Sequence, residues 1–286
     1  LRFNETTLSL RPDNLVVNGE KKKYLYAKSD APGENTQPWI PPGQSVIATE
    51  GLFDALAATY LMDTPCCAVT APSHLGRSRF PPSVQVYVSD ADVPFHHAES
   101  LLAMVVGYCR ERGLKIAHMP RNPAANYVFS NKIPEDCKWG MEEWARVWGV
   151  NARICMEQLI KDAKEPVPYL QALFNEYKEI GLRYPKNLVT IANGARAIAD
   201  ATMRSYERDG LRDLLKQCTG APKKTLDAII QKRIDNINRS SGALISSASA
   251  GQGVVLPSIR KVNPSKADLQ RYLAGKYSLR FNELTQ

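Results

Sequence analysis

Long hydrophobic runs are missing from this sequence of 286 residues. The longest apolar run, residues 101–106, is about a third of the ~20 residues that a membrane-spanning helix needs. No signal peptide is recognisable, so neither a membrane protein nor a secreted mini-protein is expected. The composition of 44% hydrophobic and 23% charged residues excludes a disordered chain. The length allows one large or two ordinary domains, each with its own core.

Metal-binding patterns of cysteine and histidine are also missing. The six cysteines contain no C-x-x-C pair, and the adjacent Cys66 and Cys67 cannot chelate as such a pair does. The four histidines show no metal-ligand spacing either. A zinc ribbon is therefore not expected, and the cysteines are interpreted as free thiols in a reducing cytoplasm.

A balance of charge is missing in the second half of the chain, where Lys and Arg are in excess. Residues 1–150 contain 15 Lys or Arg and 16 Asp or Glu, a net charge of −1. Residues 151–286 contain 22 Lys or Arg and 13 Asp or Glu, a net charge of +9. This imbalance predicts an anionic partner for the second half, with nucleic acid as the first candidate. The alternative is a soluble helical surface, because dispersed Lys and Arg are common on helices.

Apolar patterning divides the chain into an α/β part and a helical part. Short apolar runs that predict strands alternate with helical spacing, which indicates βαβ units and a parallel sheet. The expected strands are 46–49, 67–70, 84–89 and 114–118, and the expected helices are 52–62, 95–109 and 141–148. After residue 150, apolar residues at i, i+3, i+4 spacing predict helices over 169–180, 188–203, 211–218 and 226–237.

The ends of the chain differ from this pattern. Residues 21–26 predict a short strand with a basic approach, and Ser, Gly and Ala dominate residues 239–253, which predicts a flexible linker. The sequence of residues 1–5 recurs at 279–283, which suggests a fragment of a longer protein. The expected division is a basic β segment (1–45), an α/β domain (46–150), a basic α-helical domain (151–238), the linker (239–258) and the start of a further module (259–286).

Carboxylates follow two of the expected strands. Glu50 comes directly after one strand, and Asp90 and Asp92 follow another. The carboxyl ends of parallel strands meet at one edge of the sheet, where α/β proteins place their functional groups. Three carboxylates around one point repel one another unless a divalent ion neutralises them. The sequence therefore predicts a Mg²⁺ (or Mn²⁺) site that keeps several waters and substrate phosphates.

Two neighbours of Glu50 have roles that the sequence leaves open. Gly51 is expected to let the chain turn tightly into the helix and to approach substrate phosphates. Asp54 lies one turn after Glu50. It either joins the metal site or only serves its helix, as a cap or as a charge that complements the helix dipole.

Residues 49–56 (Thr-Glu-Gly-Leu-Phe-Asp-Ala-Leu) and 88–92 (Val-Ser-Asp-Ala-Asp) resemble the TOPRIM domain. This domain is shared by DnaG-type primases, plasmid and phage primase-helicases, type IA and II topoisomerases and OLD-type nucleases, and the first motif is most similar to the primase branch. The resemblance covers about residues 45–145. It implies a compact, Rossmann-like parallel sheet with Glu50, Asp90 and Asp92 around Mg²⁺, serving phosphoryl transfer.

The resemblance implies the primase core of a bacterial, plasmid or phage replication protein. Such a core would make short primers from NTPs on single-stranded DNA, with no membrane and with a replicative helicase that is fused or separate. Asp90 and Asp92 would hold the metal, and Glu50 would be a ligand or a general base. Two alternatives are an OLD-like nuclease and a non-catalytic module that binds DNA or docks a helicase. The second stays open because residues 93–97 replace the small residue and glycine that often follow the aspartates in primases.

Basic residues in three places are candidates for contact with phosphates. Arg77 and Arg79 suit bidentate phosphate contacts, or belong to an ordinary basic loop. A run at the start of the chain would line the template path, or be a solvated strand edge. A third group lies on the last two expected helices, where it would follow a DNA backbone or form the basic face of a helical hairpin. The run is Lys21, Lys22 and Lys23, and the third group is Lys216, Lys223, Lys224, Lys232 and Arg233.

One further acidic motif follows the last expected strand. Residues 138–144 (Lys-Trp-Gly-Met-Glu-Glu-Trp) resemble the short acidic motif of plasmid and phage TOPRIM proteins. Glu142 and Glu143 would extend the acidic site, or occupy solvated positions on an amphipathic helix. Trp139, Trp144 and Trp148 are expected to pack in the core rather than stack on bases.

Overall fold

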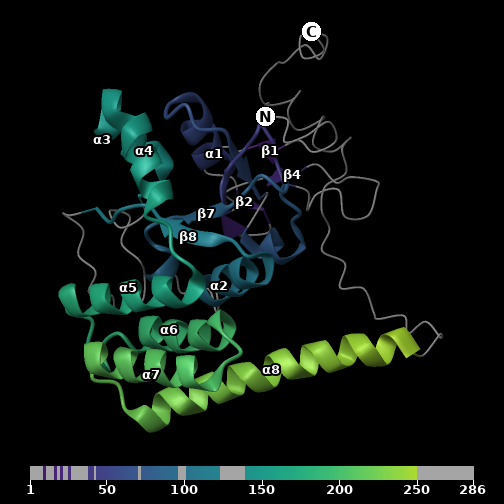
Figure 1. Cartoon of the computed structure of the whole chain (residues 1–286), viewed down its shortest axis with the longest axis vertical. Helices are drawn as coiled ribbons and strands as arrows, with labels where there is room; N and C mark the ends of the chain where they lie inside the picture. Colours follow the sequence, from purple (N-terminus) through teal and green to yellow (C-terminus); the bar gives the residue numbers. More distant parts are fainter. Residues whose placement is uncertain are drawn as a thin grey trace.

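The computed structural model of the protein describes residues 9–10, 16–17, 20–21, 25–26, 38–41, 43–69, 72–95, 101–122 and 139–249. Its centre is a parallel sheet with the strand order β6–β5–β7–β8 (Figure 1). The strands are β5 (Ile47–Thr49), β6 (Cys66–Ala68), β7 (Val86–Ser89) and β8 (Lys115–His118). The prediction of a mixed α/β fold with a parallel sheet followed by helices is confirmed.

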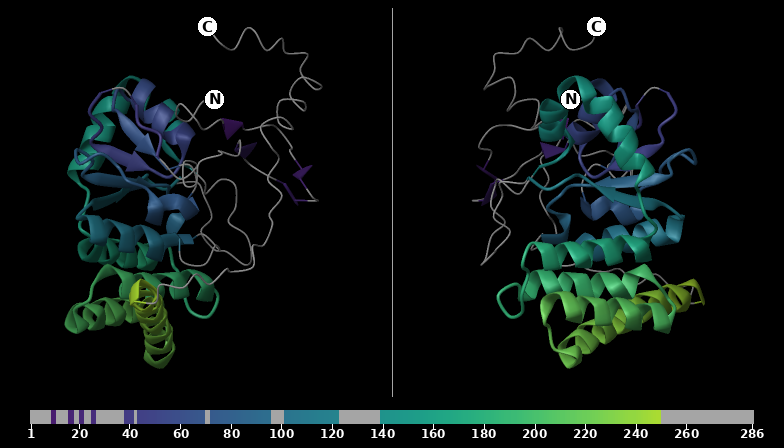
Figure 2. Two further views of the ribbon diagram at one scale, coloured as in Figure 1. Left: turned by 90° about the vertical axis from the view of Figure 1, so that its right-hand side faces the viewer. Right: turned by 60° about the vertical axis from the view of Figure 1, so that its left-hand side comes forward.

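Helices cover both faces of this sheet, as the views in Figure 2 show. One face carries α1 (Leu52–Tyr60), α3 (Met141–Trp148) and α4 (Ala152–Lys161), and the other carries α2 (Leu101–Arg112) and α5 (Pro166–Glu179). Alternate residues of β7 point to opposite faces. Val86 and Val88 belong to the core under α1, α3 and α4, and Tyr87 belongs to the core under α2 and α5. Burial on both faces explains why the strands appear as continuous apolar runs in the sequence.

The remaining helices form a further layer on the α2 and α5 side. They are α6 (Leu188–Ala201), α7 (Ser205–Thr219) and α8 (Lys223–Ser249). Small residues let α6 approach its neighbours closely: a Cβ added at Gly194 would lie 3.1 Å from the Phe174 ring. One continuous core includes Tyr87 of the sheet, Phe174 of α5 and Leu226 of α8. The helical half is therefore packed onto the sheet through a shared core.

The helix boundaries around α7 agree with the sequence. Gly220 caps α7 in the left-handed conformation, with φ +72°, and α8 begins three residues later. This is the predicted end of one helix at a glycine and start of the next near Pro222. No helix in the described part of the chain is long and apolar enough to cross a membrane.

The described residues differ from the predicted local structure in three places. The linker expected from residue 239 begins as helix, because α8 continues to Ser249. Ser and Ala are compatible with a helix, and the single glycine of that stretch costs only about 1 kcal/mol. Phe95, where a helix was expected to begin, belongs to a 3₁₀ turn over 93–95, and α2 is described from Leu101 onward. Of the strand expected over 21–26, Lys21 belongs to β3 (Glu20–Lys21), which is paired with β2 (Val16–Val17), whereas β4 (Leu25–Tyr26) is paired with β1 (Ser9–Leu10); residues 22–24 lie outside the described part.

Helix α4 has no counterpart among the predicted elements. It fully buries only Ala152 and Met156, so its apolar stripe is narrow. Other expectations lie outside the described residues: Lys22 and Lys23, the linker beyond 249, the module from 259 and both copies of the repeated pentapeptide.

Candidate metal centre

Three carboxylates meet where β5 and β7 end. These strands are parallel neighbours in which Thr49 is paired with Val88, so Glu50 and Asp90 leave the sheet side by side. Oxygen atoms of Glu50, Asp90 and Asp92 all lie within 4.8 Å of one another. The structure thus brings together the three residues that the sequence proposed as metal ligands.

The turn after β7 directs Asp92 to the same point. The backbone N–H of Val93 donates to the carbonyl of Asp90 at 3.2 Å, and that of Phe95 donates to the carbonyl of Asp92 at 2.8 Å. This tight turn ends the alternation of side chains along the strand, and it buries Val93 and Phe95 as an apolar anchor. Asp92 is itself 8% exposed. Both aspartates of the motif therefore face one centre.

The electrostatics of this group favour a bound cation. Burial raises the pKa of Asp90 well above its usual value, and the charges of Asp54, Glu50 and Asp92 raise it further. The Oδ1 atom of Asp90 is buried and has no hydrogen-bond partner among the described residues. Buried polar atoms almost always have a hydrogen-bond donor or a bound ion as partner. Carboxylate oxygens are what Mg²⁺ and Mn²⁺ prefer, so the residues fit a divalent ion.

Asp54 contacts a different element. Its Oδ1 atom accepts a hydrogen bond of 2.9 Å from the backbone N–H of Met141, the first residue of α3. Although its charge reaches Asp90, its oxygens are not in the group of three that lies within 4.8 Å. Gly51 precedes α1 with φ −125° and ψ 137°, an extended conformation open to any residue. The expectation that Gly51 is needed for a tight turn is therefore wrong, because its backbone is extended.

Glu142 and Glu143 do not join the three carboxylates. The carboxylate of Glu143 accepts a hydrogen bond of 2.9 Å from the N–H of Gly140, which caps the start of its own helix. Glu142 forms an ion pair with Arg146 one turn further on. Both glutamates thus serve α3.

Arg77 and Arg79 are exposed, and neither forms an ion pair with any carboxylate in the described part of the chain. The carbonyl of Ser78, between them, accepts a hydrogen bond of 3.1 Å from the Tyr108 hydroxyl. Tyr108 lies in the second half of α2, which runs from the end of β7 back to the start of β8. The pair therefore lies along α2, and the described ion pairs include none between it and the acidic group.

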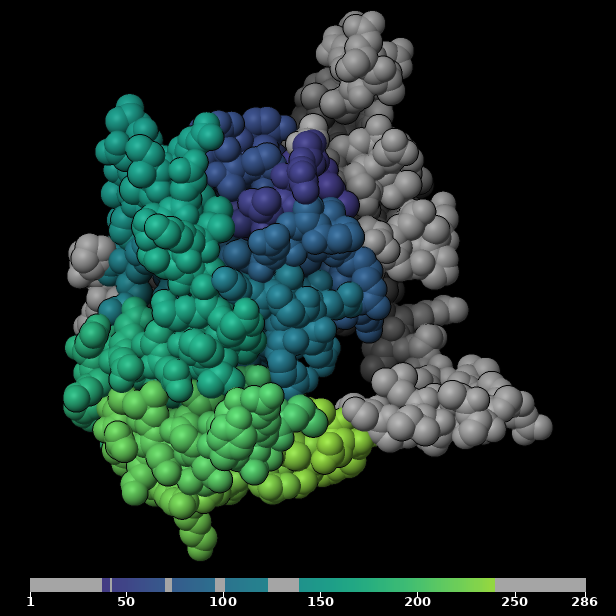
Figure 3. All heavy atoms as spheres, in the orientation of Figure 1, coloured from purple at the N-terminus to yellow at the C-terminus, as the bar shows by residue number. Residues whose placement is uncertain are grey.

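The cations proposed on the last two helices fall into two kinds. Lys216, Lys223, Lys224 and Lys232 are exposed on α7 and α8, which form the end of the molecule away from α1 and α3 (Figure 3). Arg233 instead points into the protein, where it holds Asp200 of α6 through two hydrogen bonds of 2.7 and 3.0 Å. Arg233 is therefore committed to an internal ion pair. Lys21 lies in β3, and nothing further is described for its side chain.

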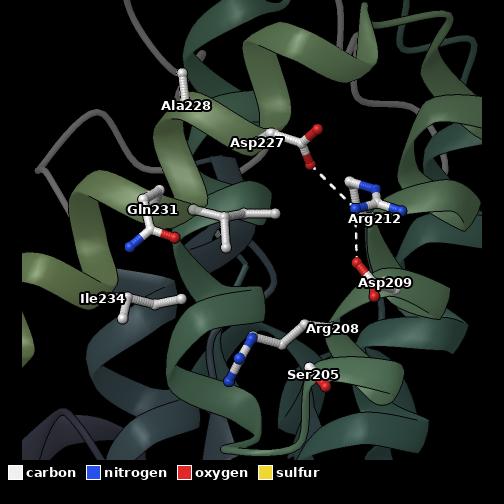
Figure 4. A pocket seen from close by; sticks show the side chains of 9 residues that line it. Ser205, Arg208, Asp209, Arg212, Asp227, Ala228, Gln231 and Ile234 are labelled. Atoms are coloured by element: carbon white, nitrogen blue, oxygen red, sulfur yellow. Dashed lines mark hydrogen bonds and ion pairs between the residues drawn. The ribbon is translucent and has the colours of Figure 1, made fainter.

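A pocket of about 500 Å³ lies between α7 and α8 (Figure 4). Arg212 lines the pocket and forms ion pairs with Asp209 at 2.6 Å and with Asp227 at 3.1 Å, so opposite charges offset one another there. Ile230 and Ile234 supply its apolar lining. The positive charge in the pocket is therefore neutralised by carboxylates. The exposed lysines differ, because none of them belongs to a described ion pair.

One cluster at the end of β8 escaped sequence reasoning. His118 lies 3.7 Å from the carboxylate of Glu176 on α5, and Arg121 pairs with the same carboxylate. Burial lowers the pKa of His118, and the charge of Glu176 opposes this. The cluster ties the edge strand to α5. No spacing in the sequence could have indicated it, because its members come from separate elements.

Three solved structures of DNA primases are similar to this chain at low TM-score and low sequence identity. No family model and no curated protein matches the sequence. A DNA primase domain from Pseudomonas aeruginosa is similar in structure, with a TM-score of 0.39, 15% identity and coverage of 76% of this chain and 66% of that one. The Aquifex aeolicus primase (zinc-binding and RNA polymerase domains) has a TM-score of 0.40 and 14% identity, with coverage of 74% of this chain and 48% of that one. A structure of the DnaG catalytic core has a TM-score of 0.36 and 16% identity, with coverage of 74% of this chain and 66% of that one.

This chain spans about half to two thirds of the length of those primase chains. At these identities and TM-scores, the likeness carries no conclusion about chemistry. Function is therefore inferred from the residues of the site.

Proposed function

We propose that this chain is the catalytic core of a primase-type nucleotidyltransferase, which uses a divalent metal ion to make short primers on single-stranded DNA. The observation that carries the proposal is the meeting of Glu50, Asp90 and Asp92 at the carboxyl ends of two adjacent parallel strands. The resemblance of the two motifs to the primase branch of TOPRIM supports the choice of reaction.

The three carboxylates are proposed to hold Mg²⁺ or Mn²⁺. When bound, the ion neutralises the phosphates of a nucleoside triphosphate and helps to orient an in-line attack at the α-phosphate. Asp90 and Asp92 contribute ligand oxygens from one short turn, so their separation is fixed by the backbone. Glu50 comes from a different strand and serves as a further ligand or as a general base.

The exposed lysines are proposed to hold the template. Lys216, Lys223 and Lys224 surround the turn between α7 and α8, and Lys232 lies further along α8. Lysine contacts of this kind bind phosphates without reading sequence. Arg77 and Arg79, exposed beside α2, are proposed to contact phosphates of DNA or of the nucleotide. Arg233 is left out of this set because Asp200 holds it.

Primer synthesis tests the proposal directly. The chain is incubated with the four NTPs, Mg²⁺ and single-stranded DNA, and labelled products are resolved by length. We expect short oligonucleotides from the wild type, and a loss of about 100-fold or more for Asp90→Asn and Asp92→Asn. Asp63→Asn is the matched control, because Asp63 is an exposed carboxylate that pairs with Arg153. Asp63 has φ +49°, a conformation that asparagine also accepts.

The other outcomes distinguish the alternatives. Metal-dependent shortening of the DNA, lost in the same two variants, would replace the primase with a nuclease that uses the same site. DNA binding without either product would leave a non-catalytic module. Equal loss of primers in Asp63→Asn would show that the substitutions act through the fold and not through the metal ligands.

A further inference from the structure

Two glycines make room for a single carboxylate. A Cβ atom added at Gly51 would lie 2.5 Å from Oδ2 of Asp54, and one added at Gly140 would lie 2.5 Å from Oδ1 of the same residue. Such separations are far below van der Waals contact. Gly51 stands at the start of α1 and Gly140 at the start of α3, so the Asp54 side chain is enclosed between two helix beginnings.

Space, and not backbone conformation, requires glycine at both positions. Gly51 has φ −125° and ψ 137°, and Gly140 has φ −111° and ψ −160°. Both conformations are extended and are accepted by residues with a Cβ. What a side chain would meet at each position is the Asp54 carboxylate.

The enclosed carboxylate holds the first turn of α3. Oδ1 of Asp54 accepts from the Met141 N–H at 2.9 Å, and Glu143 accepts from the Gly140 N–H at 2.9 Å. Two of the N–H groups that a helix leaves without partners are thus satisfied. A negative charge at this end also complements the helix dipole. One cap comes from α3 itself, and the other comes from α1.

The same turn of α3 borders the acidic group. A Cβ at Gly140 would lie 3.2 Å from Oδ1 of Asp90, and the Ala91 N–H donates to the Trp139 carbonyl at 3.4 Å. We propose that Asp54 is a positioning residue and not a metal ligand: it fastens the start of α3 against Asp90 and so fixes one wall of the metal site. The proposal rests on the proposed function only in taking the acidic group to bind a metal.

Tryptophans on α3 and just before it provide a readout that does not depend on activity. The rings of Trp139 and Trp144 have centroids 5.0 Å apart, and those of Trp144 and Trp148 lie 5.4 Å apart. The indole N–H of Trp144 donates to the Pro120 carbonyl at 2.6 Å. Three of the four tryptophans of the chain therefore report on the placement of α3.

The first test compares Asp54→Asn with Asp54→Ala in the full chain, using tryptophan emission and Mn²⁺ titration. Asparagine keeps the Oδ1 acceptor, so we expect wild-type emission and Mn²⁺ affinity within about threefold of the wild type. Alanine removes the acceptor, so we expect emission at longer wavelength and about tenfold weaker Mn²⁺ binding, as for other residues that orient metal ligands. Asp63→Ala is the control and should change neither.

A ligand role for Asp54 gives the opposite pattern. Asp54→Asn would then lose Mn²⁺ binding as severely as Asp90→Asn, with unchanged tryptophan emission, and this result would overturn the proposal. Loss of primer synthesis with the predicted emission and Mn²⁺ data would instead count only against the proposed reaction. The two failures are thus separable.

The second test is a double-mutant cycle between Asp54 and Gly140. Gly140→Ala should lower the unfolding midpoint of the wild type, because its methyl group meets the Asp54 carboxylate. In the Asp54→Ala background this loss should be smaller by about half or more, since the closest clash is gone. Equal losses in the two backgrounds would show that Asp54 does not set the requirement for glycine, and would overturn the proposal.

Discussion

Two regions of the molecule hold an aspartate in opposite electrostatic surroundings, one buried and one half-buried. At the junction of α6 and α8, Asp200 is 8% exposed and receives two hydrogen bonds from Arg233. At the carboxyl end of the sheet, Asp90 meets other carboxylates. Burial raises the pKa of both residues; at Asp200 the Arg233 guanidinium opposes the shift, whereas at Asp90 the neighbouring charges increase it.

The difference separates a structural ion pair from a site that needs a ligand. The chain supplies the cation for Asp200 and none for Asp90 among the described ion pairs. Each aspartate is also approached by a glycine: a Cβ at Gly107 would lie 3.1 Å from Asp200, and one at Gly140 would lie 3.2 Å from Asp90. Close packing is thus common to both regions, and the source of the positive charge is what differs.

Breaking the internal pair should have the largest effect on stability. Arg233→Met leaves Asp200 buried without its cation, which we expect to cost about 3 kcal/mol of unfolding free energy, the lower end for a buried pair because Arg233 is partly exposed. Urea denaturation measures it. The control is Lys232→Met, an exposed neighbour that should change stability by less than about 0.5 kcal/mol. Equal effects would mean that the pair contributes nothing beyond a surface contact.

Adding a divalent ion should stabilise the other region almost as strongly. At a Mg²⁺ concentration of about 100 times Kd, linkage predicts a gain of about 2.7 kcal/mol, measured as a rise in unfolding midpoint that a chelator reverses. Asp92→Asn should abolish most of this gain, whereas Arg233→Met should retain it from a lower starting stability. A gain that is the same in Asp92→Asn would place the ion elsewhere.

Removing a carboxylate from the acidic group should raise stability when no divalent ion is present. Repulsion from the neighbouring charges destabilises the folded protein by on the order of 1 kcal/mol even with the screening of water, so we expect Asp90→Asn to gain about 1 kcal/mol in a chelator. Asp63→Asn, at an exposed position, should gain nothing.

The pH dependence follows from the raised pKa of Asp90. The folded protein holds this proton more tightly than the unfolded chain, so the contribution to stability is complete at low pH. It is lost as pH rises from the ordinary value near 4 through the raised value. The metal-free wild type should therefore lose stability over that range more steeply than Asp90→Asn. Parallel profiles would contradict the repulsion.

The smallest effect on stability is expected at the exposed lysines. Lys223→Ala and Lys224→Ala should leave the unfolding free energy within about 0.5 kcal/mol of the wild type. They should weaken binding of single-stranded DNA and reduce the slope of log K against log salt by about 0.7 for each lost phosphate contact. Lys161→Ala on α4 is the control, since α4 covers the opposite face of the sheet. Raised salt should weaken DNA binding far more than Mn²⁺ binding.

The sequence was sufficient for the parts that local pattern determines. The four strands, the helix 141–148 and the glycine that ends α7 follow from apolar periodicity and capping. The convergence of Glu50, Asp90 and Asp92 followed from the single rule that parallel strands end at one edge. Both depend on neighbours in sequence or on a general property of the fold.

Side-chain pairings between elements that are distant in the chain could not be predicted from the sequence. The hydrogen bond from Met141 to Asp54 and the tie from Arg233 to Asp200 join helices that only tertiary packing brings together. Arg233 and Lys232 are equivalent as members of a basic run, yet one turns inward and the other stays exposed. Only the path of α8 over α6 decides which of them meets a carboxylate.

Calorimetric titration with Mn²⁺ tests the central claim most directly. The wild type and Asp63→Asn should show saturable binding of equal affinity, and Asp90→Asn and Asp92→Asn should show a loss of about 100-fold or more. Binding that survives in both of these variants would contradict the assignment of the acidic group as a metal centre.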